Sequence, residues 1–155
     1  MKLNMDKKRR AVLYAVLWMA LIFFFSSFSS EDSSEQSGKV VRLVLWIVRS
    51  LFGEKMATAL AGAGIEFYIR KAAHFTEYAI LGVLVTRALL LNSAGHPALA
   101  LVICAAYAGL DEFHQFFVSG RSMELRDVCI DSSGALFGIL AYMLGRTALK
   151  RVRKT

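Results

Sequence analysis

The chain has 155 residues, 56% of them hydrophobic, and a formal net charge of +7 at pH 7. A soluble domain contains about 45–50% apolar residues, and the surplus here is gathered into blocks, which indicates membrane spans within one domain, residues 1–155. The basic residues lie in short tails beside these blocks and no nucleic-acid-binding module is visible, so no nucleic-acid partner is expected. The two cysteines, Cys104 and Cys129, lack C-x-x-C spacing and indicate no disulfide framework.

Four apolar blocks approach the length of about 20 residues that a helix needs to cross a bilayer. They predict spans at about residues 11–28, 72–91, 97–118 and 128–144. The first block follows "KKRR", as in a secretory signal peptide. Because the apolar run is long and no A-x-A cleavage site follows it, we expect an uncleaved first span.

A fifth apolar block, residues 39–53, is short for a span. Its basic residues Lys39, Arg42 and Arg49 gather toward one helix face, and an apolar stripe lies away from it, formed by Val41, Leu45, Val48 and Phe52. This pattern predicts an amphipathic helix in the membrane surface, with an additional span as the alternative. The expected fold is an all-α membrane protein with four transmembrane helices and one interfacial amphipathic helix between spans one and two.

The distribution of charge predicts the orientation of this fold. With both termini in the cytoplasm, the cytoplasmic segments carry 11 basic residues and one acidic residue, and the opposite side carries 8 and 11. Basic residues favour the cytoplasmic side, so we expect a multi-pass protein of the cytoplasmic membrane with both termini cytoplasmic. A fifth span would place one basic tail outside.

Polar side chains gather at the outer ends of three expected spans. In chain order, the helical faces are Arg70, His74, Glu77 and Tyr78; then Tyr107, Asp111, His114 and Gln115; then Asp127 and Asp131. A charge within a membrane is costly unless it is paired. We therefore expect one outer polar pocket, in which Arg70, Lys71, His74 or Arg121 compensates Asp111 and Asp131.

The segments around this pocket carry further expectations. Gly120 permits a tight turn that would hold Arg121 and Arg126 over the mouth of the pocket. Glu112 points away from the Asp111 face, toward the surface helix or solvent. The Gly134-x-x-x-Gly138 spacing predicts close packing of helices.

Two motifs, "RKAAHFTEYAILG" (residues 70–82) and "YAGLDEFHQFFVSGRSMELRDVCIDSSGALFG" (residues 107–138), resemble the VanZ-like family of small integral membrane proteins. Residues 25–40 resemble the serine-rich stretch that those proteins carry after the first span. The matching positions are Arg70, Lys71, His74, Glu77, Tyr78, Asp111, Glu112, Gln115, Phe117, Gly120, Arg121, Asp127, Asp131 and Gly134. Asp131 stands where many members carry Asn. The resemblance implies a bacterial cell-envelope protein, and the founding member of the family is linked to teicoplanin resistance.

Several functions fit these residues. In the first, the pocket binds membrane lipid, as an anionic lipid or lipid-linked cell-wall precursor whose phosphate or carboxylate meets Arg70, Lys71, Arg121 and Arg126. The expected ligand-binding set is Arg70, Lys71, His74, Glu77, Tyr78, Tyr107, Asp111, Glu112, Gln115, Arg121, Asp127 and Asp131.

The alternatives assign the same side chains to other tasks. A membrane-embedded enzyme could use His74, Glu77 and Asp111 as acid–base groups on a lipid-linked substrate, although no G-x-S-x-G motif is present. A metal site could draw on His74, Glu77, Asp111, Glu112 and His114, but no H-E-x-x-H spacing occurs and neither a metal nor another cofactor is expected. The polar residues could also serve only to lock the helices together.

Overall fold

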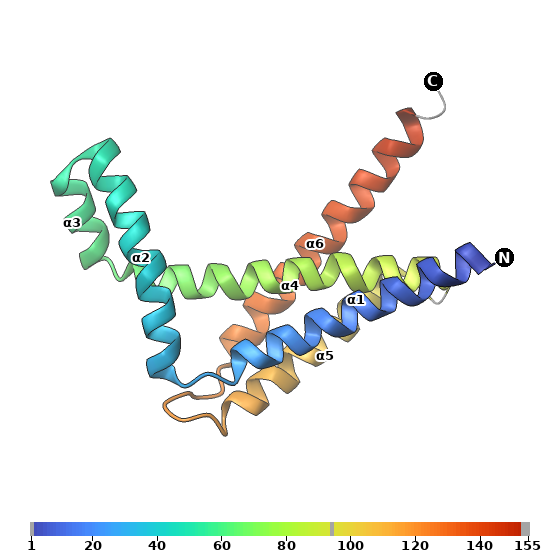
Figure 1. Ribbon diagram of the computed structural model, residues 1–155, viewed down its shortest axis with the longest axis horizontal. Helices are drawn as coiled ribbons and strands as arrows, with labels where there is room; N and C mark the ends of the chain where they lie inside the picture. Colours follow the sequence, from blue (N-terminus) through green and yellow to red (C-terminus); the bar gives the residue numbers. More distant parts are fainter. Residues whose placement is uncertain (1, 94, 153–155) are drawn as a thin grey trace.

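A computed structural model describes residues 2–93 and 95–152 of the chain, and these residues form six α-helices with no β-strand (Figure 1). The helices are α1 (Lys2–Ser26), α2 (Ser30–Phe52), α3 (Glu54–Gly62), α4 (Ile65–Leu91), α5 (Pro97–Gln115) and α6 (Leu125–Val152). The expectation of an all-α protein is therefore confirmed for this part of the chain.

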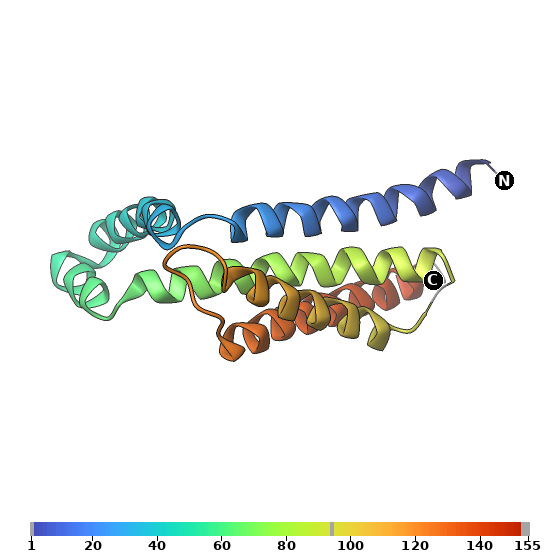
Figure 2. The ribbon, with the colours of Figure 1, turned by 90° about the horizontal axis from the view of Figure 1, so that it is seen from below.

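Helices α1, α4 and α5 run side by side, and α6 crosses α4 obliquely (Figures 1 and 2). The start of α1 and the end of α6 lie toward one end of this bundle, whereas α2, α3 and the loop between α5 and α6 lie at the other (Figure 1). Helix α2 turns away from α1 and runs across the direction of α4. The arrangement therefore collects the α1–α2 turn, the start of α4, the end of α5 and the start of α6 in one region.

The closest helix packing joins α4 to α6, and glycines make it possible. A Cβ atom added at Gly134 would collide with the backbone oxygen of Phe75, and one at Gly138 with that of Ala79. The Gly134-x-x-x-Gly138 spacing therefore produces the close approach that it predicted. The neighbouring core holds Tyr78, Leu81 and Val85 of α4, Cys104 and Ala108 of α5, and Ala135 and Ile139 of α6.

Within the described residues, three helical segments are long and apolar enough to cross a membrane: Met5–Ser26, Ile65–Leu91 and Leu125–Val152. Large apolar side chains remain exposed on them, for example Leu17, Phe24 and Leu144. These properties are those of a membrane protein. Helix α5 corresponds to the remaining predicted span, but it is not among the three, since its last turns carry Asp111, Glu112, His114 and Gln115.

Several helix limits differ from those predicted. Helix α2 covers the expected segment 39–53 but begins earlier, where the Ser29 side chain accepts the backbone N–H of Asp32 at 3.1 Å. Helix α3 was not predicted. Helix α4 begins at Ile65 rather than near residue 72, and an ion pair one turn apart, Glu66 to Arg70 at 3.0 Å, lies in the added turns. Helix α5 ends at Gln115 rather than at 118, and α6 continues to Val152 instead of ending near 144.

Candidate functional site

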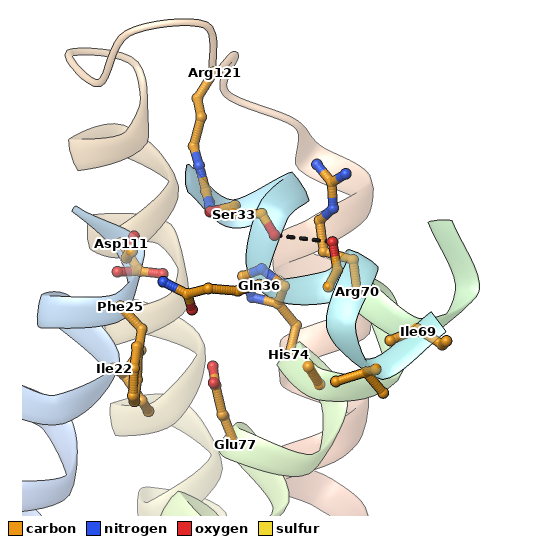
Figure 3. A pocket seen from close by; sticks show the side chains of 14 residues that line it. Ile22, Phe25, Ser33, Gln36, Ile69, Arg70, His74, Glu77, Asp111 and Arg121 are labelled. Atoms are coloured by element: carbon orange, nitrogen blue, oxygen red, sulfur yellow. Dashed lines mark hydrogen bonds between the residues drawn. The ribbon is translucent and has the colours of Figure 1, made fainter. Parts of the chain in front are cut away.

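A cavity of about 300 Å³ lies where α1, α2, α4, α5 and the α5–α6 loop meet (Figure 3). One part of its wall is apolar, formed by Ile22, Phe25, Val40, Ile69 and Ala73. The other part is polar, formed by Ser26, Ser33, Gln36, Ser37, Arg70, His74, Glu77, Asp111 and Arg121. The cavity thus offers both a surface for hydrocarbon and a set of charged groups.

Helix α4 supplies the cavity with Arg70, His74 and Glu77. Their spacing of four and then three residues places them one above another on a single helix face. His74 and Glu77 point into the cavity in Figure 3, and Arg70 lies nearer the start of the helix. The predicted polar face of this helix is therefore directed at the cavity.

The α5–α6 loop brings Arg121 into the same space. Gly120 has φ +72°, a conformation that L side chains rarely adopt, and a Cβ there would lie 3.0 Å from the Cβ of Ser30. The Arg121 guanidinium donates to Gln115 Oε1 at 3.0 Å and to the Ser33 hydroxyl. Burial, followed by the nearby charge of Arg70, lowers the pKa of Arg121 from its ordinary value. No Asp or Glu oxygen of the described residues comes within 4.0 Å of its nitrogens.

Helix α2 completes the wall with side chains to which the sequence assigned no role. Besides Ser33, the Ser34 hydroxyl accepts a hydrogen bond from Arg70 at 3.3 Å, and the Ser37 hydroxyl donates one to Glu66 at 3.1 Å. The only signal for these contacts was the serine-rich stretch at residues 25–40. It resembled a family feature but did not show which way its side chains point.

Asp111, on α5, is 1% exposed and lines the cavity. Its Oδ2 accepts a hydrogen bond from Gln115 at 3.4 Å, so Gln115 links Asp111 to Arg121. Its Oδ1 has no hydrogen-bond partner of good geometry among the described residues. The Asp111 carboxylate therefore lines the cavity while it is enclosed by the protein, with Gln115 bonded to one oxygen and the Ser26 hydroxyl beside the group.

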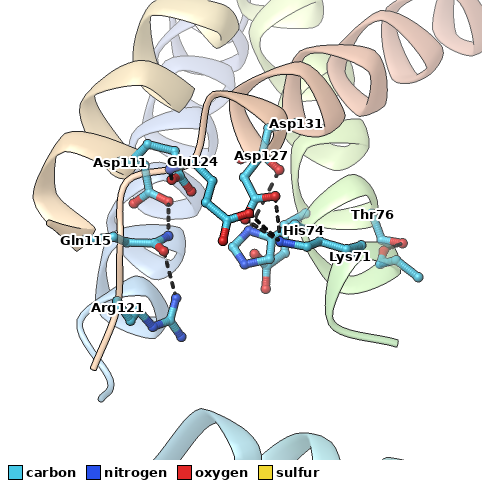
Figure 4. A network of polar contacts seen from close by, with 12 residues as sticks. Lys71, His74, Thr76, Asp111, Gln115, Arg121, Glu124, Asp127 and Asp131 are labelled. Atoms are coloured by element: carbon cyan, nitrogen blue, oxygen red, sulfur yellow. Dashed lines mark hydrogen bonds and ion pairs between the residues drawn. The ribbon is translucent and has the colours of Figure 1, made fainter. Parts of the chain in front are cut away.

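A second polar group lies on the α6 side of α4 and does not line the cavity (Figure 4). Lys71 Nζ lies 2.6 Å from Asp127 Oδ1, and Glu124 lies 4.0 Å from the same nitrogen. Lys71 and Asp127 were predicted in the ligand-binding set, but the structure pairs them with each other. Their charges are satisfied without a ligand.

Asp131 lies behind His74 as seen from the cavity. It is fully buried, its Oδ1 is 3.7 Å from His74 Nδ1, and neither oxygen has a hydrogen-bond partner in the described part of the chain. The structure therefore brings five predicted residues to the cavity wall, Arg70, His74, Glu77, Asp111 and Arg121, and sets Asp131 in contact range of one of them.

Two expectations about neighbouring residues were wrong. Glu112 was expected to face the surface helix or solvent, but it is fully buried and its Oε2 accepts the backbone N–H of Glu124 at 2.8 Å. The loop folds back over α5, which puts this carboxylate against the start of α6. Arg126 was expected over the mouth, yet it lies beside the Phe67 ring, with the ring centroid 5.7 Å from its Cζ, and outside the cavity lining.

The two tyrosines of the predicted set lie in the helix interfaces. Tyr78 is fully buried, and its ring centroid is 6.3 Å from that of Tyr107. The Tyr107 hydroxyl donates to the backbone oxygen of Met19 at 2.6 Å, so it ties α5 to α1. Neither residue lines the cavity.

Among residues 2–93 and 95–152, no three His, Cys, Asp or Glu side chains are placed so that they could hold a metal ion. The candidate metal ligands of the sequence are thus not arranged as a metal centre. His114 instead packs against the Phe23 ring at a centroid distance of 4.2 Å.

Comparison with known proteins gives one family. The model of the family described as VanZ/LLP1 matches residues 11–146. No curated protein and no solved structure matches the chain.

Proposed function

Since the chain belongs to the VanZ/LLP1 family, whose model matches most of its length, we propose that it binds an anionic lipid or a lipid-linked cell-wall precursor by its head group. The proposal places it in the bacterial cytoplasmic membrane with both termini in the cytoplasm. The cavity then opens on the extracytoplasmic side. The VanZ-like resemblance recognised in the sequence is confirmed, and the ligand is our inference from the cavity.

In this proposal α5 is a fourth span. Its 19 residues extend for about 28 Å at 1.5 Å per residue, close to the hydrocarbon thickness of about 30 Å. It runs beside α1 and α4 in Figures 1 and 2, and its polar end lies at the same end of the bundle as α2. Its acidic side chains turn inward, since Asp111 and Glu112 are both buried.

Helix α2 is the interfacial helix of the proposal. It has no buried residue, and Leu43, Trp46 and Leu51 on it are 56%, 64% and 69% exposed. It crosses the direction of α1 and α4 (Figure 1), as a helix lying in the membrane surface would. Its serines contact Arg70 and Arg121, so its polar side adjoins the cavity.

One observation carries the proposed binding of an anion: Arg121 is partly buried in the cavity without an acidic partner. Its two hydrogen-bond partners, Gln115 and Ser33, are neutral. A second guanidinium, that of Arg70, lines the same cavity. Two cations beside an apolar wall suit a ligand with a phosphate or carboxylate head and a hydrocarbon tail.

Native mass spectrometry of the purified full-length protein tests this. We expect a co-purifying anionic lipid on the wild-type chain and its loss in Arg121→Gln. Arg126→Gln is the matched control, because it removes the same charge in the same region but outside the cavity. Thermal unfolding in detergent verifies that both variants fold. An unchanged lipid complement in folded Arg121→Gln would refute the proposal.

The proposal extends to teicoplanin resistance, to which the founding member of the family is linked. If the head group is that of a cell-wall precursor, expression of the chain in a susceptible bacterium should raise the inhibitory concentration of teicoplanin, and Arg121→Gln should abolish the rise. An inhibitory concentration that is the same with and without the chain would show that this protein does not confer teicoplanin resistance. Lipid binding is tested independently by mass spectrometry.

A second candidate function, an enzyme acting on a lipid-linked substrate, is favoured by one arrangement. His74 and Glu77 both line the cavity, and Asp131 lies 3.7 Å behind His74 Nδ1, where a carboxylate can orient an imidazole. Incubation of the wild-type protein with candidate lipid-linked substrates should then yield a product that His74→Gln does not form. Ligand recovered unaltered by both proteins would exclude catalysis on that substrate.

A further inference from the structure

The cavity has two chemically different ends. At the end that we call the mouth, Arg121 reaches in from the α5–α6 loop and Arg70 lies on the first turns of α4 (Figure 3). At the end that we call the floor, Glu77 lies seven residues further along α4, about 10 Å at 1.5 Å per residue. The mouth is cationic and the floor is acidic.

The floor holds a carboxylate that the protein itself leaves without a partner. Among the described residues, no hydrogen bond or ion pair reaches the Glu77 carboxylate, which lines the cavity. The Asp111 side chain also lines the cavity, but it is 1% exposed and has Gln115 and the Ser26 hydroxyl beside it. An acceptor enclosed in a cavity without a hydrogen-bond partner is destabilising, so Glu77 is suited to a ligand that supplies donors.

A bare anion does not fit this distribution of charge. A phosphate that filled the cavity would gain from Arg70 and Arg121 at the mouth, but it would meet the carboxyl groups of Glu77 and Asp111 at the floor. Like charges at short range repel, most strongly where water is excluded. The favourable ligand therefore carries its negative charge at one end and hydrogen-bond donors at the other.

We propose that the ligand is a phosphoester whose head group bears hydroxyl or ammonium donors, with the phosphate at Arg121 and Arg70 and the donors at Glu77. This inference rests on the proposed function and deepens it. Glu77 is then the specificity residue. A head group ending in an unsubstituted phosphate is disfavoured, and one in which the phosphate bears a glycerol, sugar or aminoalcohol is preferred.

The test compares two lipids with identical acyl chains, phosphatidylglycerol and phosphatidic acid, added to delipidated full-length protein and measured by native mass spectrometry. We expect phosphatidylglycerol to bind at least about five-fold more tightly, since hydrogen bonds to a charged acceptor are about twice as strong as neutral ones. In Glu77→Gln the ratio of the two affinities should fall toward one, because the amide removes the negative charge and offers hydrogen-bond donors to the phosphate of phosphatidic acid. Glu54→Gln, which makes the same change on exposed α3, should keep the wild-type ratio.

The outcomes separate this inference from the function on which it rests. If both lipids bind equally to the wild type and both are lost in Arg121→Gln, the anion site stands and the specificity is refuted. If neither lipid binds the wild type, this inference is refuted, and the anion site is judged separately by the lipid that co-purifies with the protein. A soluble arm identifies the source of the head group: displacement of phosphatidylglycerol by glycerol phosphate but not by inorganic phosphate shows that the head group alone suffices. Equal displacement by both would overturn the role of the floor.

Discussion

At the scale of single residues, the most consequential pair outside the cavity is Lys71 and Asp127. Both side chains are largely buried, at 15% and 10% exposed, and they meet across α4 and α6. A buried ion pair adds little net stability compared with well-packed apolar residues, but removal of one partner leaves an uncompensated charge. The pair therefore ties α4 to α6.

We predict that Lys71→Met lowers the stability of the protein by about 3 kcal/mol or more, since it strands the Asp127 carboxylate. The double variant Lys71→Met with Asp127→Leu should recover most of that loss. Thermal unfolding in detergent measures both effects. Arg126→Gln is the control, because its ion pair with Glu124 is exposed and contributes little. Equal unfolding temperatures for Lys71→Met and Arg126→Gln would contradict the assignment.

Residue spacing predicted the polar face of α4 but not the partners of its members. Arg70, His74 and Glu77 all line the cavity because their spacing in the sequence, combined with the fixed pitch of a helix, places them on one face. Glu112 was misplaced because its environment depends on a loop that folds back so that the Glu124 backbone meets it. Helical periodicity contains no information about such a fold-back.

At the scale of elements, the contact between α4 and α6 depends on the absence of side chains. Phe75 and Ala79 present backbone oxygens where Cβ atoms at Gly134 and Gly138 would lie. In a membrane, where lipid is as apolar as the helices, such close packing is a main source of association. The two helices thus hold Lys71 of α4 beside Asp127 of α6, as Figure 4 shows.

Gly138→Ala should therefore destabilise the protein by about 1–3 kcal/mol, the usual cost of overpacking a well-filled contact. Gly145→Ala on the same helix is the matched control, because a Cβ there would meet nothing within 4 Å. The unfolding temperatures of the two variants, measured in the same detergent, decide the matter. A Gly138→Ala protein as stable as the control would show that the helices do not pack this closely.

Helix α2 shows why element limits were harder to predict than element type. Its apolar half, near residues 39–53, was recognised from periodicity. Its first turns contain Ser33, Ser34 and Ser37, which have no strong helical preference of their own. They are helical because Ser29 caps the segment and because their hydroxyls find Arg121, Arg70 and Glu66. Those partners are remote in sequence.

At the scale of the whole molecule, the start of α1 and the end of α6 lie toward one end of the bundle (Figure 1). The cavity is lined by α2 and the α5–α6 loop, which lie toward the other end. This arrangement agrees with the sidedness inferred from the basic residues, which are concentrated in the terminal segments. The proposed outer position of the cavity depends on that sidedness.

Cysteine labelling in intact cells tests it. With Cys104 and Cys129 replaced by alanine, single cysteines at Lys55 and Met123 should react with a membrane-impermeant maleimide. Single cysteines at Lys8 and Arg146 should react only after the membrane is permeabilised. Labelling of the cysteines at positions 55 and 123 from opposite sides of the membrane would disprove the four-span arrangement. Protection of both cysteines in intact cells would show that the protein has the opposite orientation.

Helix α2 contacts the cavity on one side and is exposed on the other, and this has a mechanical consequence. Its exposed apolar residues would lie among lipids, while its serine hydroxyls hold the guanidinium groups of Arg70 and Arg121. A lateral pressure that tilts or slides α2 must also displace these two guanidinium groups, since each is bonded directly to a serine side chain of the helix. The affinity of the cavity for its ligand would then depend on the tension of the outer leaflet. In a bilayer under strain, the two guanidinium groups would lie in different positions and bind the ligand differently.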